Sequence, residues 1–394
     1  MNQNKPRFVG ESRRVKLGEL ITKAKVERCG NRNFPVYSMT MHDGIVEQAG
    51  RFKKSIASKD TSSYKVVTKN QLVVGFPIDE GVIYVQNHDE PGIMSPAYNV
   101  WDFDQSRLDP AYLELALHSP QSMAYYADKM RGTTARRRSL TADGLRSLSI
   151  PLPSMDKQLE IVAALKGIKA QISYAQDQAS KLDQLVKSRF VEVFGTADRP
   201  PAEFPVSTIG EVCDSVIRGP FGSALKKSFF VPKGDDTYKV YEQKHAIQRR
   251  SDIGTYYITS NKYEELKRFE CFPGDILMSC SGTMGKLYQL PQDCERGVMN
   301  QALCKFKLGN SILPDYFFGF MEQVVDDLGA KGSGIKNVSS VKFIKAIKIP
   351  LPPIEVQLDF AAFVSQVDKP RFAIQQQIEK LEMLKASLMQ EYFG

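Results

Sequence analysis

The chain contains one stretch of sequence twice. Residues 150–195 align without a gap on residues 349–394 when the sequence is shifted by 199 positions. Both copies open with Ile-Pro-Leu-Pro, continue with Gln-Leu and Gln-x-Gln-x-x-Lys-Leu, and end in Phe-Gly. Chance would not hold one register over 46 positions. An internal duplication therefore constrains the fold more than any other feature of the sequence.

Each copy predicts a long helix with a heptad seam. Mostly apolar residues recur at alternating intervals of four and three, which is the spacing of a coiled coil. The leading Ile-Pro-Leu-Pro is predicted to be extended, because residues before proline avoid the α region. The predicted seam positions are Ile161, Leu165, Ile168, Ile172, Ala175, Ala179, Leu182, Val186, Arg189 and Val193 in the first copy, and Phe360, Val364, Val367, Arg371, Ile374, Ile378, Leu381, Lys385, Leu388 and Tyr392 in the second, with Leu384 expected to replace Lys385.

A proline predicts that the second helix is interrupted. Pro370 has no amide N–H and crowds the preceding turn. We therefore expect a short helix, a break near residue 370 and a long helix of roughly 23 residues, which would span about 35 Å. Gly167 suggests a similar weak point in the first copy. Paired helices of this kind could simply form a structural coiled coil, or they could hold two globular segments at a fixed spacing, close to the roughly 34 Å of one DNA turn.

Composition excludes several classes of protein. The 394 residues suffice for two domains with helices, and the formal charge of +8 fits a polyanionic partner without demanding one. No apolar run approaches 18 residues and the N-terminus has no apolar signal core, so we expect a cytoplasmic protein. The six cysteines form no Cys-x-x-Cys pair, so neither zinc nor a disulfide framework is expected.

Residues 1–149 are predicted to form a first globular segment. Short strands are expected at 65–68, 72–74 and 81–85, because β-branched residues alternate there with turn signals. The stretch from Pro110 to Met130 is predicted to be helical. A basic loop follows it, with Arg131 and Arg136-Arg137-Arg138, before the first repeat helix begins.

Residues 196–348 echo this first segment. The stretch 206–212 resembles 15–20, residues 274–278 match 70–74, Gly285 falls opposite Gly81, and 297–303 match 92–98. A helix is again expected at 314–328, followed by a loop with Lys331 and Lys336. The duplication thus covers the whole chain, but the globular segments have diverged far more than the helices. Similar helices combined with divergent globular segments suggest that the two segments recognise two different targets.

These features together resemble the specificity (S) subunit of type I restriction-modification systems. The resemblance covers nearly all of the chain, and the order and duplication of its motifs are more specific than any single one. It departs from the family pattern at Lys157 and Val356, where the family often has Glu before the Gln. The motifs that carry it are the two Ile-Pro-Leu-Pro…Gln-Leu helix starts, the two closing Phe-Gly pairs, Gly219-Pro-Phe-Gly-Ser223…Lys226, Gly274-Asp-Ile-Leu…Ser281-Gly-Thr-Met-Gly-Lys286 and Gly92-Ile-Met-Ser-Pro-Ala-Tyr98.

The resemblance implies a fold, partners and a division of labour. It implies a mixed α/β chain in which two target recognition domains are separated by two long helices packed as an antiparallel coiled coil. Each domain would read one half of a split site in double-stranded DNA. Two modification subunits would methylate adenine from S-adenosylmethionine, with or without two restriction subunits that use ATP and Mg²⁺, and this chain would hold no cofactor and catalyse nothing. The expected domains are 1–149 and 196–348, with helical spacers at 150–195 and 349–394.

Basic residues in loops are the candidate DNA contacts, because lysine and arginine neutralise phosphates and arginine can bind guanine edges. Loops that are merely solvated are the alternative. The pairs Lys226-Lys227, Lys53-Lys54 and Arg249-Arg250 are weaker candidates. The principal candidates are Arg131, Arg136, Arg137, Arg138, Lys331 and Lys336.

Motifs for chemistry are missing from the sequence. The stretch 282–286 resembles a phosphate-binding loop, but Cys280 and Leu287 occupy positions that need glycine and Ser or Thr, so we expect a turn between strands. Asn33-Phe34-Pro35 does not match an amino-methyltransferase pocket, and the four histidines have no metal spacing. Two alternatives to DNA recognition stay open: a coiled-coil adaptor that binds proteins, and an enzyme that acts alone on DNA.

Overall fold

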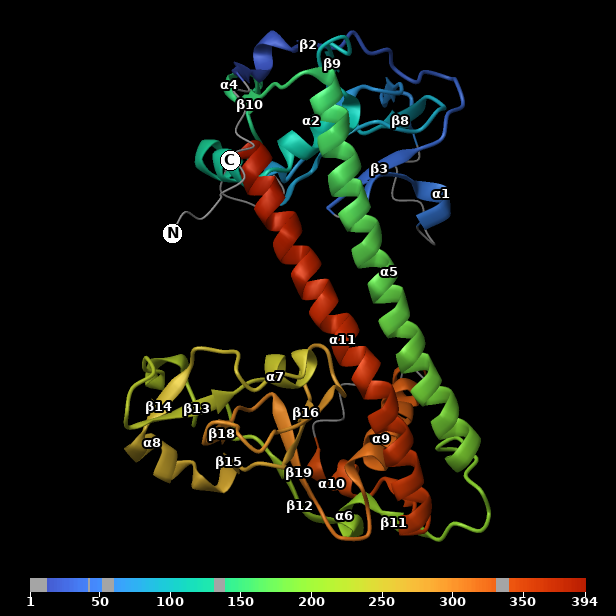
Figure 1. The fold of residues 1–394 in the computed structure, drawn as a ribbon, viewed down its shortest axis with the longest axis vertical. Coiled ribbons are helices and arrows are strands. Elements are labelled where there is room, and N and C mark those ends of the chain that lie inside the picture. Colours follow the sequence, from blue (N-terminus) through green and yellow to red (C-terminus); the bar gives the residue numbers. More distant parts are fainter. Residues whose placement is uncertain (1–12, 42, 52–59, 131–138, 331–339) are drawn as a thin grey trace, which may run out of the picture. The chain divides into compact units, whose positions relative to one another are not determined.

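The computed structural model describes residues 13–41, 43–51, 60–130, 139–330 and 340–394 (Figure 1). The chain divides into two compact units. Unit 1 contains Met1–Asp177 and Gln375–Gly394, and unit 2 contains Gln178–Ile374. Two helices of 40 residues, α5 (Met155–Phe194) and α11 (Ile354–Phe393), each contribute one part to each unit. Among the described residues, no helix is both long and apolar enough to cross a membrane.

Unit 1 is built around a four-stranded antiparallel sheet with the order β2-β9-β6-β7. Leu72 of the central strand β6 pairs with Trp101 on one side and Val85 on the other, and all three side chains are buried. Its strands and helices are β1 (Arg14–Lys16), η1 (Leu17–Glu19), β2 (Ile21–Lys23), β3 (Tyr37–Thr40), β4 (Gly44–Glu47), α1 (Gln48–Arg51), β5 (Lys65–Val67), β6 (Leu72–Val74), η2 (Ile78–Glu80), β7 (Ile83–Val85), β8 (Gly92–Met94), β9 (Asn99–Phe103), α2 (Pro110–Leu117), α3 (Pro120–Lys129), α4 (Ala142–Ser147) and β10 (Ser149–Pro151).

The helix predicted over 110–130 is two helices, so that prediction is wrong in its continuity. α2 ends at Leu117, and Ser119 then adopts an extended conformation and caps α3 by accepting a hydrogen bond from the amide of Ser122. Pro120 occupies the first turn of α3, where a missing amide hydrogen costs nothing. The Ser-Pro pair therefore ends one helix and starts the next.

Unit 2 repeats this sheet with the order β12-β19-β16-β17. Ile276 of β16 pairs with Phe306 of β19, and both side chains are buried. Its strands and helices are β11 (Val206–Thr208), α6 (Ile209–Val212), β12 (Cys213–Arg218), η4 (Lys227–Phe229), β13 (Thr237–Tyr241), α7 (Gln243–Gln248), β14 (Tyr257–Thr259), α8 (Ser260–Glu265), η5 (Lys267–Phe269), β15 (Glu270–Cys271), β16 (Ile276–Ser279), β17 (Leu287–Gln289), β18 (Gly297–Met299), β19 (Leu303–Leu308), α9 (Pro314–Ala330), α10 (Val341–Lys345) and β20 (Lys348–Pro350).

The echo between the two segments is confirmed in the backbone. Asn70 and Gly274, each two residues before a central strand, both have positive φ, at 64° and 85°. Gly81 and Gly285 likewise have φ of 81° and 77°. At equivalent positions α4 and α10 each place a basic residue against a glycine, because a Cβ on Gly18 would lie 2.9 Å from the Cβ of Arg146, and one on Gly210 would lie 3.1 Å from the Cβ of Lys345.

The units differ in their other strands. In unit 2, β14-β13-β18-β15 form one sheet in which β13 and β18 are parallel, with Lys239 opposite Gly297. In unit 1 the corresponding part of the chain forms two separate pairs, β3-β4 and β5-β8. In Figure 1 the β13–β14 strands lie on the side of unit 2 away from α9 and the start of α11. The divergence between the globular segments is therefore concentrated outside the shared sheet.

The predicted break near residue 370 is wrong, because α11 runs through Pro370 without interruption. The proline lies on the exposed face of the helix, where a carbonyl that loses its amide partner can bind water. One turn before the proline Val367 is buried, and the residue after the proline, Arg371, forms ion pairs with Asp183 and Asp368. Gly167 does not interrupt α5 either.

The heptad seam is confirmed in part. In α11 the seam positions are buried or half-buried, but at the end of the helix the buried residue is Phe393 and not the seam residue Tyr392. Lys385 is half-buried while Leu384 is 48% exposed, so the expected replacement by Leu384 is wrong. In α5 the seam is buried from Ile161 to Ala175. Towards its end Phe190 and Phe194 are buried and Arg189 is exposed, so the buried stripe there is shifted by one residue from the prediction.

Both units contain the same junction between globule and helix. The repeated Ile-Pro segments are extended as predicted and pair with the first strand of their unit, β10 with β1 and β20 with β11. Gln158, fully buried, accepts from the amide of Asp109 and donates to the carbonyls of Arg107 and Pro153. Gln357 does the same with Leu313, Ser311 and Pro352. The duplicated Gln is thus a buried clamp that fixes the start of each helix.

Candidate nucleic-acid interface

All six principal candidate DNA contacts lie outside the described residues. The loop with Arg131, Arg136, Arg137 and Arg138 falls between α3 and α4. The loop with Lys331 and Lys336 falls between α9 and α10. The weaker candidates Lys53 and Lys54 also lie outside the described part. For these loops the structure establishes only that they connect equivalent helices of the two units.

Lys226 and Lys227 are both exposed and follow strand β12 after a loop of seven residues, 219–225, that contains two glycines. Neither side chain has an acidic partner within the described part of the chain. Leu225, just before them, is buried and anchors this end of the loop. The two ammonium groups are therefore held at a fixed place in unit 2, with their charges available to an anion.

Three segments meet at the end of β12 and β16, and we refer to them together as the loop cluster: residues 219–225, 280–286 and 300–302. The amide of Gly219 donates to the carbonyl of Leu303 at 3.0 Å, and the amide of Cys280 donates to the carbonyl of Ala302 at 2.8 Å. A Cβ on Gly219 would lie 1.8 Å from the carbonyl oxygen of Asn300, so only glycine allows this approach. The cluster is therefore fixed by backbone contacts.

An aromatic side chain projects from this cluster. Phe221 is 89% exposed, although the residues on either side of its loop, Pro220 and Leu225, are buried. Its carbonyl accepts a hydrogen bond from the amide of Ala224 at 2.8 Å, which closes a tight turn. Ser281, Thr283 and Lys286 of the facing loop are also exposed. The sequence marks this Gly-Pro-Phe-Gly stretch only as a motif of the family resemblance, because the exposure of one ring is a tertiary property.

Arg249 and Arg250, the other weaker pair, already have acidic partners. Arg249 lies 3.3 Å from Glu322, and Arg250 binds Asp252 with two hydrogen bonds of 2.6 and 2.9 Å. Ion pairing with Arg250 lowers the pKa of the Asp252 carboxyl to about 2. These two cations are therefore less available to phosphates than Lys226 and Lys227.

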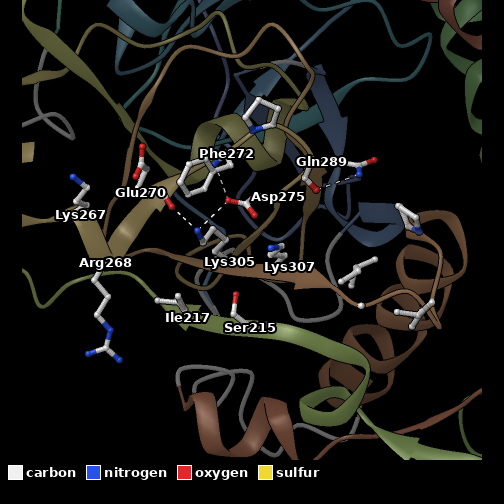
Figure 2. A pocket seen from close by; sticks show the side chains of 16 residues that line it. Ser215, Ile217, Lys267, Arg268, Glu270, Phe272, Asp275, Gln289, Lys305 and Lys307 are labelled. Atoms are coloured by element: carbon white, nitrogen blue, oxygen red, sulfur yellow. Dashed lines mark hydrogen bonds and ion pairs between the residues drawn. The ribbon is translucent and has the colours of Figure 1, made fainter.

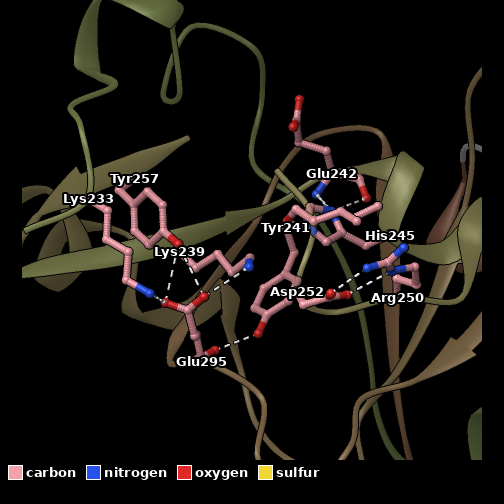
Figure 3. A network of polar contacts seen from close by, with 10 residues as sticks. Lys233, Lys239, Tyr241, Glu242, His245, Arg250, Asp252, Tyr257 and Glu295 are labelled. Atoms are coloured by element: carbon pink, nitrogen blue, oxygen red, sulfur yellow. Dashed lines mark hydrogen bonds and ion pairs between the residues drawn. The ribbon is translucent and has the colours of Figure 1, made fainter. Parts of the chain in front are cut away.

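A polar network around Glu295 supports the second sheet of unit 2 (Figure 3). Its carboxylate accepts hydrogen bonds from Lys239 at 3.1 Å and from the Tyr257 hydroxyl, and it pairs with Lys233 at 2.7 Å. Lys239 is 1% exposed, so without this carboxylate its ammonium group would be buried with no counter-charge. Burial alone would raise the pKa of Glu295, but the hydrogen bonds from Lys233 and Lys239 outweigh it and lower the pKa. The network ties β13, β14 and the segment before β18 together.

A cavity of about 800 Å³ in the same unit is lined by residues of β12, β15 and β19 (Figure 2). Lys305, nearly buried, lies between the carboxylate of Asp275, at 3.0 Å, and the carbonyl of Glu270. The ring of Phe272 covers the ammonium group, with its centroid 5.4 Å away. Because the central cation is already neutralised, this arrangement is structural and resembles no catalytic site.

Chemistry for an enzyme is not apparent among the described residues. They contain no group of three or more His, Cys, Asp or Glu side chains that could hold a metal ion. The predicted turn at 282–286 is confirmed, since it joins the antiparallel strands β16 and β17. The buried His245 accepts at Nδ1 from the amide of Glu242 and donates from Nε2 to the carbonyl of Ile253, which makes it a core residue.

Comparison with known proteins points to one family. Residues 201–383 match the family described as the type I restriction modification DNA specificity domain. A protein of Methanocaldococcus jannaschii provisionally named the MjaX type I restriction enzyme specificity subunit is 24% identical over 349 residues, which is 86% of this chain and 80% of that protein. The MjaVIII specificity subunit of the same organism is 30% identical over 102 residues, 25% of this chain and 24% of that protein.

Two solved structures share the fold. A chain from a study of complex assembly and conformational transition of the type I R-M system matches with a TM-score of 0.52 and 18% identity, over 96% of this chain and 97% of that one. The S subunit of a type I system from M. genitalium matches with a TM-score of 0.50 and 14% identity, over 97% and 96%. The mixed α/β fold class predicted from the sequence is thereby confirmed, and so is the predicted resemblance.

Proposed function

We propose, given that the chain is a specificity subunit of the type I restriction-modification family, that it binds an asymmetric, bipartite site in double-stranded DNA. Each unit would read one half-site, and the chain would direct adenine methylation, and cleavage where restriction subunits exist, by its partners. Specificity subunits are the non-catalytic recognition component, so S-adenosylmethionine, ATP and Mg²⁺ would act in those partners. The globular segments 1–149 and 196–348 would be the two target recognition domains.

One observation supports the proposal: both units contain the same junction between globular segment and helix, but their remaining strands differ. Gln158 and Gln357 form the same buried clamp, and the sheets β2-β9-β6-β7 and β12-β19-β16-β17 have the same order. The remaining strands differ, as a four-stranded mixed sheet in unit 2 and as two separate pairs in unit 1. A shared sheet and clamp that carry different outer strands suit a chain whose two units read two different half-sites.

Each head would contact phosphates through basic loops. In unit 2, Lys226 and Lys227 are exposed cations beside the loop cluster, and we assign them to the backbone of one half-site. The same role is proposed for Lys331 and Lys336, and in unit 1 for Arg131, Arg136, Arg137 and Arg138. Equivalent loops would then contact the DNA backbone at both half-sites.

The duplicated helices offer equivalent sites for two modification subunits. In each Gln-Leu pair the glutamine is buried, whereas Leu159 and Leu358 are 49% and 52% exposed. Leu185 and Leu384, also equivalent in the repeat, are each 48% exposed. Exposed leucines at matching places on both copies suit two identical partners.

The two helices would also act as a ruler. In each unit the start of one long helix shares a hydrophobic core with the end of the other, Ile161 and Leu165 with Phe393 in unit 1 and Phe360 and Val364 with Phe194 in unit 2. We propose that the helices pack as an antiparallel coiled coil along the spacers 150–195 and 349–394. The length of this coiled coil would set the gap between the half-sites.

Methyl transfer in vitro tests the proposal. The modification subunit is purified with and without this chain, and transfer of labelled methyl groups from S-adenosylmethionine to a library of random duplexes is measured. We expect methylation of one bipartite motif only when the chain is present. If the modification subunit methylates the same sites without it, the chain is an adaptor that binds proteins, and if the chain alone transfers methyl groups, it is an enzyme.

A further inference from the structure

An exposed phenylalanine in unit 2 stands out from the other apolar side chains on the surface. At 89%, Phe221 is the most exposed large hydrophobic residue among those described, ahead of Phe372 at 66%. Full exposure of a phenyl ring is unfavourable in water, because the ring leaves apolar surface in contact with water. The ring is also part of a loop whose two ends are fixed, so the exposure is built into the fold.

Backbone contacts and buried side chains fix both ends of the loop that carries Phe221. Gly219 is held against Asn300 and donates to Leu303, and Pro220 and Leu225 are buried on either side. A Cβ on Gly222 would meet only the side chain of Gln301, at a distance of 4.0 Å, so the tip itself is uncrowded. The ring therefore projects from a firm base into open space, which is the geometry of a wedge.

The surroundings of the ring match a nucleic acid better than a protein groove. Lys226 and Lys227 follow within six residues, and Lys286 is exposed on the facing loop of the cluster. None of these three cations has an acidic partner among the described residues. An exposed apolar ring on a loop cluster that also carries free cations complements a duplex, where phosphates flank a stack of bases.

We propose that Phe221 enters the half-site bound by unit 2 as an apolar wedge between neighbouring base pairs. The inference rests on the proposed function and adds a mechanism to it. A wedge unstacks one base step, and the energetic cost depends on which step is deformed, so Phe221 would contribute sequence preference without a hydrogen bond to any base. Unit 1 has no such exposed ring at the equivalent place among its described residues, because the segment after β2, the strand that corresponds to β12, carries Phe34, which is half-buried with Arg32 over its ring.

Substitutions of Phe221 in the complex with the modification subunit test the wedge. The probe is a duplex of the methylated motif with 2-aminopurine placed in turn at each step of the unit 2 half-site, since this base fluoresces when unstacked. We expect the wild-type complex to brighten one step, Phe221→Ala to abolish the signal and weaken binding by about tenfold to a hundredfold, and Phe221→Leu to keep most of both. The salt dependence of Phe221→Ala binding should be unchanged, because no charge is removed.

Phe272→Ala is the matched control. Phe272 is 51% exposed in the same unit, but it precedes β16 and covers Lys305, whereas the loop cluster follows β16. We expect it to bind and brighten the probe as the wild type does. The proposed function fails if the wild-type complex has no preference for any duplex. The wedge fails if the wild type is selective and Phe221→Ala matches it, or if Phe221→Ala loses the modification subunit without DNA, which would assign the ring to a protein interface.

Discussion

The ring of Phe393 packs against the ring of Tyr112, with their centroids 5.4 Å apart. The same contact recurs in unit 2, where Phe194 lies 4.7 Å from Tyr316. Each tyrosine hydroxyl donates to the carbonyl of the second residue of the repeated Ile-Pro motif, Tyr112 to Pro151 and Tyr316 to Pro350. Phe393 ends α11, which begins in unit 2, and Phe194 ends α5, which begins in unit 1. The core of each unit therefore includes the last residues of the helix that begins in the other unit.

Because the end of α11 packs into the core of unit 1, we predict that the last residues of the chain stabilise unit 1. Phe393 is 1% exposed, so Phe393→Ala leaves a cavity and should lower the free energy of unfolding of unit 1 by about 3–5 kcal/mol. Thermal unfolding, monitored by hydrogen exchange of the amides in each unit, would measure this loss of stability. Phe372→Ala, at a 66% exposed position of the same helix, should change stability little. Equal effects of the two variants would show that the Phe393–Tyr112 contact does not close unit 1.

The free lysines beside the loop cluster predict a defined salt dependence. Neutralising one phosphate contributes about 0.9 to the slope of log K against log salt, so Lys226→Ala with Lys227→Ala should make that slope less steep by about 1.8. Fluorescence anisotropy with a target duplex at several salt concentrations would measure it. Arg249→Ala with Arg250→Ala removes the same charge from paired residues and is expected to change the slope much less. A lysine variant with the wild-type slope would remove these residues from the interface.

The network around Glu295 predicts a loss of stability in acid. The pKa of Glu295 is lowered in the folded state, so its contribution is fully present above the unfolded value of about 4.5 and disappears as the pH falls through the lower, folded value. Denaturant unfolding from pH 7 to 3 should therefore show the stability difference between wild type and Glu295→Gln shrinking below about pH 4.5. Glu264→Gln, at an exposed pair with Lys267, provides the control and should show a weaker trend. A constant difference over this range would contradict the assignment.

The ruler proposal predicts that gap length follows helix length. Deleting the repeated heptads 176–182 and 375–381 together would keep the seam in register and remove about 10 Å of rise from each helix. At about 3.4 Å per base pair this corresponds to roughly three base pairs. We expect the methylated motif to keep both half-sites with a shorter gap. An unchanged gap in a folded, active variant would refute the ruler.

The duplicated architecture could be predicted from sequence because its signals are local. Ile-Pro-Leu-Pro restricts the backbone at residues 150–153, and the heptad spacing marks the inner face of each helix. The positions of Gly81 and Gly285 were matched through the repeat, and both indeed have positive φ. Short-range backbone preferences and the duplication were therefore sufficient to predict the two repeated helices, whereas the mixed α/β fold class came from the resemblance to the specificity-subunit family.

What the sequence did not predict depends on tertiary contacts. A break at Pro370 followed from local propensity, but the packing of Val367 and the ion pair of Arg371 with Asp183 outweigh it. The closing roles of Phe194 and Phe393 depend on tyrosines more than 100 residues away, and no local pattern links them. The projection of Phe221 likewise depends on Asn300, across the loop cluster.

The central claim is that two unlike units of one chain read two unlike half-sites. Adenine methylation mapped across the genome of cells that express this chain with its modification subunit tests it most directly. We predict one motif of two different half-sites, separated by a gap of constant length and lost when the chain is deleted. A contiguous motif, a palindromic one, or methylation that persists without the chain would contradict the account.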